Sequence, residues 1–338
     1  MSSKTGVLLI QLGTPDSPSV PDVRKYLREF LSDARVIDIS WLARILLVNL
    51  IIAPFRAPKS AKIYKQLWTE NGSPLLFYSE RLKNKLRKII GDDFDIELAM
   101  RYQNPSMESV LEMMRKKNYH RIIILPLFPQ YASATTGSAI DKAMKIIKKW
   151  WVIPDIKIIS QFFDNEGYIN CFVQNAKNYN IDEYDHVLFS YHGLPERQVD
   201  KVYDDGKPCS DHNCENEITE DNKFCYKATC YATTRALAER LNIPKEKYTV
   251  CFQSRLDDKW LKPFADKTVI EKAKEGAKKL LVFSPAFVAD CLETTIEIGY
   301  EYQQIFKENG GEKLQLVESL NDSDLWVEAL KNLISMST

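Results

Sequence analysis

The sequence of 338 residues predicts an α/β protein with two similar halves, each built on a parallel sheet. Short apolar runs alternate with long amphipathic segments, a pattern typical of strands followed by helices that cover both faces of a sheet. The length suits two domains, because single cores stop growing near about 250 to 300 residues. Hydrophobic residues make up 45% of the chain and charged residues 27%, which is the balance of a globular protein rather than of a disordered chain.

Four apolar runs are predicted to be buried parallel strands, at 7–12, 121–128, 186–192 and 279–287. Six amphipathic segments are predicted to be helices, at 21–31, 79–90, 106–117, 139–150, 231–241 and 268–278. We place the first domain at 1–145 and the second at 146–319. A C-terminal helix at about 320–338 is expected to pack back on the first domain.

Two motifs of the first half recur in the same order in the second half. VLLIQLGTP (7–15) aligns without a gap with VLFSYHGLP (187–195), and Pro126 precedes a Thr pair at the same interval as Pro285 does. The second half has His192 where the first has Leu12, and Glu293 where the first has Ala134. Open α/β sheets bind ligands at the carboxyl ends of their strands. An imidazole and a carboxylate at matched strand ends therefore predict a reactive site in the second half.

Charge and motifs exclude several functions. Lys plus Arg and Asp plus Glu each number 46, so no net charge favours a nucleic acid. The G-x-G-x-x-G and P-loop patterns are absent, which argues against NAD and P-loop enzymes. The G-x-S-x-G nucleophile elbow is also absent. The first residues lead directly into a predicted strand without a signal-peptide pattern. We expect a cytoplasmic protein.

Four carboxylates follow each other at intervals of three, four and four residues, at Asp290, Glu293, Glu297 and Glu301. On a helix this spacing places them along one face. A solvated acidic face is one interpretation, and a row of hard oxygen ligands that conducts a divalent cation is the other. His192 and Glu293 stand at matched strand ends, where their side chains could meet. This favours the second interpretation, a metal site with a general base.

Several motifs together identify a family resemblance. They are LGTPDSPSVPDVRKYLREFLSD (12–33), NGSPL (71–75), MRYQNPS (100–106), LPLFPQYASATTGSA (125–139), LFSYHGLPER (188–197), FQSRLDDKWLKP (252–263) and FVADCLETTIEI (287–298). In this order, from about residue 6 to about 330, they resemble ferrochelatases. The resemblance implies two Rossmann-like, chelatase-type domains with a cleft between them. It also implies insertion of Fe²⁺ into protoporphyrin IX to form protohaem, with release of two protons.

The resemblance also assigns roles to individual residues. It implies that His192 and Glu293 are the catalytic pair that meets the substrate Fe²⁺, with Asp290 and Glu297 as an outer metal path. The porphyrin pocket is expected to include Arg101, Tyr102, Tyr131 and Trp260. Neutral imidazole can accept a pyrrole proton near neutral pH. Cys291 stands where many relatives have His, which leaves open how that position handles metal.

Residues 207–230 form a polar insert in the second domain with four cysteines, Cys209, Cys214, Cys225 and Cys230. The segment has almost no apolar residues, so it needs a cross-link to become ordered. In a reducing compartment such a cluster more often binds metal than forms disulfides. The spacing C-x₄-C-x₁₀-C-x₄-C and the known clusters of some ferrochelatases favour [2Fe-2S], with Zn²⁺ as the alternative. His212 is an alternative ligand.

Residues 41–65 contain the most apolar stretch of the chain, followed by four basic residues at intervals of three. Arg44, Asn49 and Pro54 interrupt it, so it lacks the uninterrupted run of about 20 apolar residues that a membrane span requires. An apolar lip of the porphyrin pocket and a peripheral contact with the cytoplasmic face of a membrane are both compatible with this pattern.

Other functions stay open at this stage. A coproporphyrin III ferrochelatase has the same motifs, whereas a cobalt or nickel chelatase for another tetrapyrrole tends to have paired histidines. A haem- or tetrapyrrole-binding sensor needs no proton acceptor, so the His192–Glu293 pair argues against it. The protein is expected to be a monomer or a homodimer, and no pattern in the chain chooses between them.

Overall fold

The computed structural model describes residues 4–337 and divides them into two compact α/β units, in agreement with the predicted fold class. Among these residues the first unit comprises 4–128, 133–161 and 321–337, and the second comprises 129–132 and 162–320. The predicted boundary between residues 145 and 146 falls inside a helix, and the change of unit comes at 161–162. Residues 1–3 and 338, which the sequence assigns to the first domain and the C-terminal helix, lie outside the described residues.

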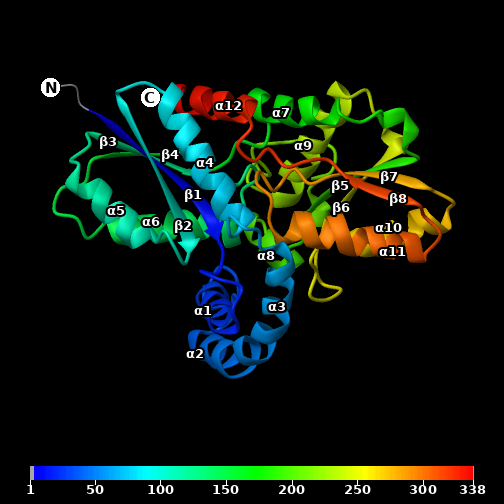
Figure 1. Ribbon diagram of the computed structural model, residues 1–338, viewed down its shortest axis with the longest axis horizontal. Helices are drawn as coiled ribbons and strands as arrows, with labels where there is room; N and C mark the ends of the chain where they lie inside the picture. The colour runs from blue at the N-terminus through cyan, green and yellow to red at the C-terminus, as the bar shows by residue number, and fades with distance from the viewer. Residues whose placement is uncertain (1–3, 338) are drawn as a thin grey trace. The chain divides into compact units, whose positions relative to one another are not determined.

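The first unit is built on a four-stranded parallel sheet of order β2-β1-β3-β4 (Figure 1). Its elements are β1 (Thr5–Gly13), α1 (Val20–Leu31), α2 (Trp41–Leu46), η1 (Leu47–Ile52), α3 (Ala53–Leu67), α4 (Pro74–Ile89), β2 (Phe94–Tyr102), α5 (Met107–Lys116), β3 (Arg121–Pro126), η2 (Ser133–Gly137), α6 (Ser138–Ile147), β4 (Asp155–Ile158) and α12 (Asp324–Ser335).

The second unit repeats this arrangement with the order β6-β5-β7-β8, again fully parallel. Its elements are α7 (Glu166–Ala176), η3 (Ile181–Glu183), β5 (His186–His192), α8 (Glu196–Val199), η4 (Asp200–Val202), η5 (Cys209–Asp211), α9 (Tyr226–Arg240), η6 (Lys245–Lys247), β6 (Tyr248–Gln253), α10 (Ala265–Lys274), β7 (Lys279–Phe283), η7 (Glu293–Tyr302), α11 (Gln303–Glu308) and β8 (Lys313–Leu316). The two halves therefore share one topology, as the repeated motifs predict.

Each of the four predicted strands is present, and all lie in the centres of the sheets. The central strands β1, β3, β5 and β7 are apolar because both of their faces are covered. The strands that the apolar pattern missed are β2, β4, β6 and β8. All four contain charged or polar residues, such as Glu97 in β2 and Lys157 in β4, because one end or one face meets solvent.

The helices begin where the sequence supplies capping side chains. Ser19, Ser106, Asn165 and Ser323 each accept a hydrogen bond from a backbone N–H in the first turn of the helix that follows. The buried faces of α5 and α6 pack on β1, β2 and β3 and form one core of the first unit. On the second sheet, α10 and α11 form the equivalent core.

Two equivalent glycines let the central strands of both sheets approach their neighbours closely. A Cβ on Gly13, which has φ +115°, would lie 2.0 Å from the carbonyl oxygen of Tyr102. A Cβ on Gly193 would lie 2.8 Å from the carbonyl oxygen of Gln253. These distances are far below van der Waals contact, so only glycine fits at either position. The same constraint therefore shapes the carboxyl edge of both sheets.

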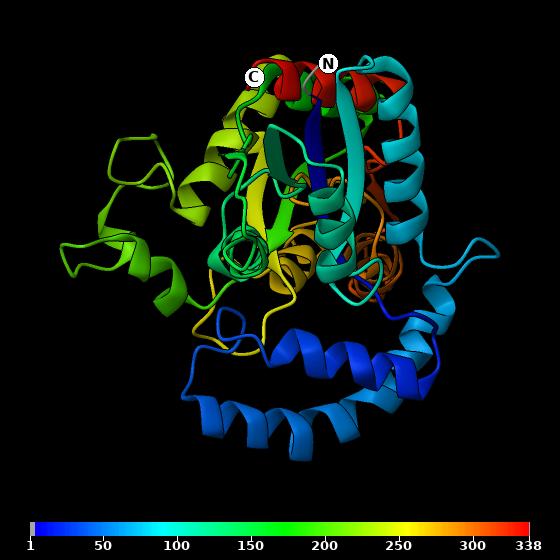
Figure 2. The same cartoon turned by 90° about the vertical axis from the view of Figure 1, so that its left-hand side faces the viewer.

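The segment after α1 forms one continuous helical stretch, Trp41–Leu67, that lies beside α1 (Figure 2). By length and composition alone it could cross a membrane. Only 22% of its most apolar window is buried inside the protein, so most of these apolar residues are not covered by the fold. Arg44 is buried and donates to the carbonyl oxygens of Ser32, Ile37 and Ile39. This guanidinium therefore anchors the start of the stretch to the loop that follows α1.

Candidate active site and cysteine group

His192 is the last residue of β5, at the carboxyl edge of the second sheet. Its ring lies beside two aromatic rings, with centroid distances of 6.5 Å to Trp260 and 6.4 Å to Phe287. Its Nδ1 is 2.6 Å from the carbonyl oxygen of Gly193. A proton on Nδ1 satisfies that oxygen and leaves Nε2 as the proton acceptor. The predicted base thus has an aromatic surround and a defined tautomer.

Hydrogen bonds at both ends hold the peptide group between His192 and Gly193. The Gly193 N–H donates to the Gln253 carbonyl oxygen at 2.7 Å, and the Tyr226 hydroxyl donates to the His192 carbonyl oxygen at 2.9 Å. Both partners are buried. The backbone of the candidate base is therefore fixed by β6 on one side and by α9 on the other.

Glu293 begins η7, a ten-residue π-helix, a rare conformation that is frequent at functional sites. The Gln253 side chain connects this start to β5, because its Nε2 donates to the Glu293 carbonyl oxygen at 3.2 Å and its Oε1 accepts from Ser190 at 2.7 Å. Asp290 lies in the turn before the helix, so the four predicted carboxylates do not all share one helical face.

Glu297, predicted as part of an outer metal path, has its carboxylate surrounded by donors. Oε1 accepts from the Ser254 N–H and the Tyr302 hydroxyl, each at 2.9 Å, and Oε2 accepts from Gln253 Nε2 at 3.1 Å and from the Ser254 hydroxyl. This carboxylate therefore ties η7 to the end of β6. The next carboxylate outward, Glu301, belongs to an exposed residue. Partial desolvation of its carboxyl group, and after it the negative charge of Glu297, raise its pKa.

Cys291 is buried and stands two residues before Glu293. Burial, and after it the charge of Glu293, raises the pKa of this thiol well above its usual value. The thiol contacts the Glu293 side chain. In this arrangement Cys291 is a neutral neighbour of the Glu293 carboxylate.

The predicted pocket residues Arg101 and Tyr102 belong to a hydrogen-bonded group in the first unit. Arg101 forms an ion pair with Asp33 at 2.5 Å and donates to the Ser138 hydroxyl at 2.7 Å, while the Tyr102 hydroxyl donates to Asp33 at 3.0 Å. Asp33 therefore balances the charge of Arg101 within the unit. Hydrogen bonds from its partners hold the pKa of Asp33 below its usual range despite burial.

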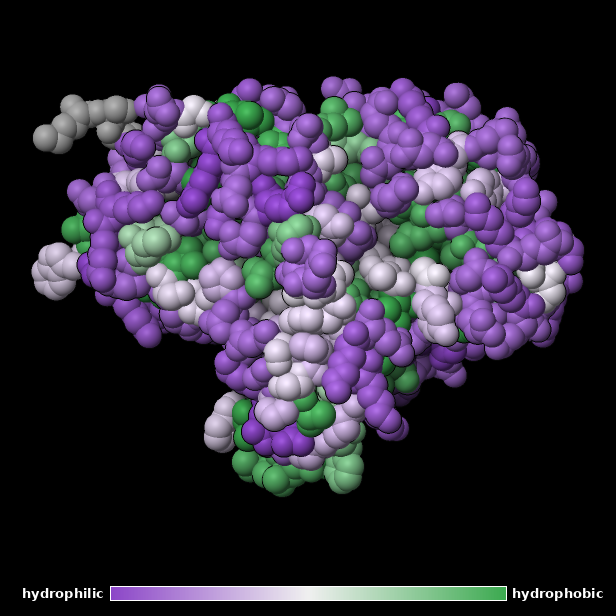
Figure 3. All heavy atoms as spheres, viewed as in Figure 1, coloured by the Kyte–Doolittle hydropathy of each residue, from purple (hydrophilic) through white to green (hydrophobic). Residues whose placement is uncertain are grey.

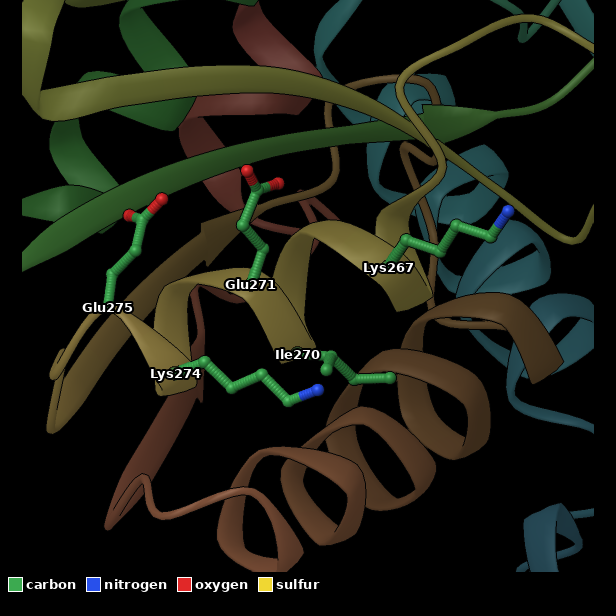
Figure 4. A pocket seen from close by; sticks show the side chains of 5 residues that line it. All are labelled: Lys267, Ile270, Glu271, Lys274 and Glu275. Carbon is green, nitrogen blue, oxygen red and sulfur yellow. The ribbon is translucent and has the colours of Figure 1, made fainter.

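The remaining predicted pocket residues lie in the second unit. Tyr131 packs edge-to-face on Phe224 of the insert, with ring centroids 5.7 Å apart. A separate shallow hollow on the surface of α10 is lined by Ile270 and charged side chains, as Figure 4 shows. None of the predicted site residues lines that hollow.

Three of the four insert cysteines come together. The Sγ atom of Cys209 lies 3.4 Å from those of Cys214 and Cys225, and the latter two are 3.7 Å apart. All three are buried and form a group suited to holding a metal ion. Hydrogen bonds from Cys209 and then from Cys214 lower the pKa of Cys225 to about 3 against the effect of burial.

The fourth cysteine, Cys230, lies outside this three-thiol group. It is fully buried on α9, one turn beyond Cys225, and burial raises its pKa. Its thiol interacts with the hydroxyl of Tyr226. The Tyr203 hydroxyl instead approaches the group, at 2.8 Å from Cys214 Sγ. His212, the alternative ligand, stacks on the Tyr203 ring with centroids 3.7 Å apart.

Among solved structures, the fold resembles that of a chelatase. SirB from Bacillus subtilis with Fe³⁺ superposes with a TM-score of 0.51 at 12% identity, covering 99% of this chain and 95% of that chain. At this identity the similarity concerns the fold alone, an α/β fold with two parallel sheets.

The sequence relationships are more specific. The family model described as Ferrochelatase matches residues 4–338. A ferrochelatase of Coxiella burnetii (strain CbuK_Q154) is 44% identical over 99% of this chain and 94% of its own length. A ferrochelatase of Legionella pneumophila (strain Lens) is 43% identical over 98% of this chain and 99% of its own length. The chain belongs to the ferrochelatase family, and its activity is the insertion of metal into porphyrin for haem synthesis.

The four donors around Glu297 lead to a prediction about stability. Glu297→Gln removes the negative charge and turns an amide N–H₂ toward groups that donate. Because hydrogen bonds to a charged group contribute roughly 1.5–3 kcal/mol, we expect the free energy of unfolding to fall by about 2–4 kcal/mol in urea titrations. Glu301→Gln, on the exposed turn of the same helix, is the control. Equal stability of the two variants would contradict a structural role for Glu297.

Proposed function

We propose that the chain inserts Fe²⁺ into protoporphyrin IX, with His192 as the base for the pyrrole protons. The observation that supports this most is the His192 side chain, which lies near the rings of Trp260 and Phe287 and has its Nδ1 bonded to the Gly193 carbonyl oxygen. Nε2 can then accept a proton while the neighbouring rings supply flat apolar contact for a macrocycle. The site that accepts protons is thus also a site that suits a porphyrin.

Glu293 is proposed as the carboxylate that works with His192. It belongs to the first turn of η7, whose start is held by Gln253 against β5, the strand that carries His192. A carboxylate on this anchored turn can attract the incoming cation and receive the protons that leave the base. Asp290 and the exposed Glu301 extend the acidic surface outward, whereas Glu297 serves mainly to hold the helix.

Arg101 and Tyr102 are proposed to act on the porphyrin indirectly. Arg101 is already paired with Asp33, so its guanidinium has less charge to offer a propionate than an unpaired one. Tyr102 is fully buried between Tyr26 and Phe30. Their shared role is then to keep the wall formed by α1 and η2 in place, while Trp260 and Tyr131 of the second unit contact the ring.

An anaerobic assay of Fe²⁺ with protoporphyrin IX tests this proposal. We expect turnover by the purified protein, and a loss of about 10²–10⁴-fold in kcat for His192→Ala, because that is the usual contribution of a general base. Porphyrin binding, measured by fluorescence, should survive the substitution. His120→Ala, which removes an exposed histidine of the first unit, should behave as the unchanged protein.

Two results would contradict the proposal. Turnover of His192→Ala within a few-fold of the unchanged protein would remove the base from His192. Turnover of coproporphyrin III with a kcat/KM above that for protoporphyrin IX would reassign the substrate while leaving the family activity intact.

We further propose that the insert carries a [2Fe-2S] cluster on Cys209, Cys214, Cys225 and Cys230. The donor set fits, because three buried thiols already lie within 3.7 Å of one another. Cys230, five residues after Cys225 on α9, is the fourth buried thiol of the insert. When bound, a cluster would cross-link the insert and supply a one-electron redox centre.

Metal and sulfide analysis of the purified protein tests this assignment. We expect about two iron and two acid-labile sulfide per chain, with visible thiolate-to-iron absorption. Cys209→Ser or Cys225→Ser should bleach the protein and lower its solubility, since the polar loop then loses its cross-link. The matched control is Cys171→Ser, a buried cysteine on α7 outside the insert. Stoichiometric zinc without sulfide would replace the cluster by a zinc site.

We also propose that the helical stretch Trp41–Leu67 lies on the surface of an anionic membrane at the cytoplasmic face. Its exposed apolar side chains gather at one end of the first unit, as the green area at the bottom of Figure 3 shows. They are Trp41, Leu42, Leu46, Leu50, Ile51 and Phe55. Four exposed basic residues follow, Arg56, Lys59, Lys62 and Lys65. Because the buried Arg44 ties the start of this helix to the first unit, a surface position suits it better than a span.

Flotation with vesicles tests the membrane contact. The protein should float with phosphatidylglycerol-containing vesicles, less so with pure phosphatidylcholine, and less at high salt, because basic side chains contribute through charge. The triple substitution of Trp41, Leu50 and Phe55 to Ser should abolish flotation. Trp151→Ser, which changes a fully exposed tryptophan elsewhere in the unit, should have no effect. Equal flotation of both variants would refute the contact.

A further inference from the structure

We propose that Tyr226 connects the cysteine group of the insert to the catalytic histidine, so that order in the insert keeps His192 in its working position. The inference rests on the proposed role of His192 as the base. It assigns Tyr226 as a positioning residue, and it gives the insert a function in the chelation reaction itself.

The first step is the attachment of Tyr226 to the histidine. Its hydroxyl donates to the His192 carbonyl oxygen at 2.9 Å, and 7% of the residue is exposed. That oxygen belongs to the same peptide group as the Gly193 N–H, which donates to the Gln253 carbonyl oxygen at 2.7 Å. Loss of either bond would let this peptide rotate about its flanking bonds. Because Nδ1 of the imidazole is bound to the next carbonyl oxygen, the rotation would also move the ring.

The second step is the attachment of Tyr226 to the cysteines. Tyr226 is the first residue of α9, and Cys225 immediately before it is the N-cap of that helix. Cys225 Sγ lies 3.4 Å from Cys209 Sγ and 3.7 Å from Cys214 Sγ. Cys230, five residues after Cys225, is buried on the same helix. Tyr226 is therefore next to one cysteine of the group, and a second cysteine follows it on α9.

The third step is the weakness of the insert without its cysteines. Between residues 204 and 224 the buried side chains are those of Cys209, Cys214 and Asn222. Asn222 forms a local turn through Thr219 and Glu217 and contributes no apolar burial. A polar loop with so little buried surface depends on the cysteine group for order, and such regions open locally at low cost.

Opening of the cysteine group therefore has a defined path to the active site. It would release Cys225, fray the first turn of α9 and withdraw the Tyr226 hydroxyl from the His192 carbonyl. The histidine would keep its side chain and lose part of its alignment, which affects a step that requires the base at a fixed distance. Binding of porphyrin by the apolar rings would change much less.

Tyr226→Phe tests this link without touching a cysteine. We expect kcat to fall about tenfold, the effect of one lost hydrogen bond, with the KM for protoporphyrin IX unchanged. Iron and sulfide content should stay at the level of the unchanged protein. Amide hydrogen exchange should rise in the peptide that covers residues 190–196. Tyr231→Phe is the matched control, because this tyrosine lies on the same helix and faces Lys227.

A double-substitution cycle with Cys209→Ser distinguishes this path from general damage. If both substitutions act through the same link, the double variant should have about the kcat of the Cys209→Ser variant. Multiplied effects, or an unchanged kcat and unchanged exchange in Tyr226→Phe, would overturn the proposal. Where Cys209→Ser protein is insoluble, Tyr226→Phe with its exchange measurement decides alone.

The two proposals fail in different ways. Absence of turnover in the unchanged protein would remove the proposed function, while exchange at residues 190–196 would still report whether Tyr226 holds the strand end. Normal turnover combined with no effect of Tyr226→Phe would remove only the link. A zinc site in place of a cluster leaves the link in force, because it depends on the cysteines being cross-linked.

Discussion

The end of β6 is the point on which the candidate site depends. There the Gln253 carbonyl accepts the N–H of Gly193, while the Gln253 side chain reaches both Ser190 on β5 and the first residue of η7. A buried amide with every group bonded is costly to disturb, since each lost partner leaves an unsatisfied polar atom. The backbones at His192 and Glu293 therefore belong to one hydrogen-bonded unit.

The close approach of the β5 and β6 backbones makes this hydrogen-bonded arrangement possible. The first sheet has the same close approach but lacks a histidine at the strand end. Gly13 meets the Tyr102 carbonyl as Gly193 meets that of Gln253. In the first unit, however, Leu12 stands at the position of His192, and the polar residues nearby form the ion-paired Arg101–Asp33 group. The same backbone constraint thus occurs beside an ion-paired group in one half and beside the candidate base His192 in the other.

The π-helix gives the carboxylates separate roles. Its first residue, Glu293, is bonded through its backbone carbonyl to Gln253, whereas the Glu297 carboxylate is enclosed by the Ser254 and Tyr302 donors, and Glu301 is exposed. A row of acidic residues in sequence is therefore not a uniform row of ligands. The insert is joined to this site by α9, since its first residue bonds the His192 carbonyl and its N-cap belongs to the cysteine group.

The sequence by itself determined the α/β class, the two similar halves, the central strands and most helices, because apolar periodicity and repeated motifs report burial directly. It also identified His192, Glu293 and the insert cysteines as candidates, since reactive residue types at strand ends and in a core-less loop stand out. Polar strands such as β4 were not visible, because their burial is partial. Gln253 and Tyr226 also carried no signal, for a buried amide or phenol acquires its role only from partners distant in sequence. Tertiary structure likewise decided that Glu297 is enclosed, that Arg101 is paired with Asp33, and that Cys230 lies apart from the other three cysteines, because each depends on which side chains folding brings within hydrogen-bonding distance.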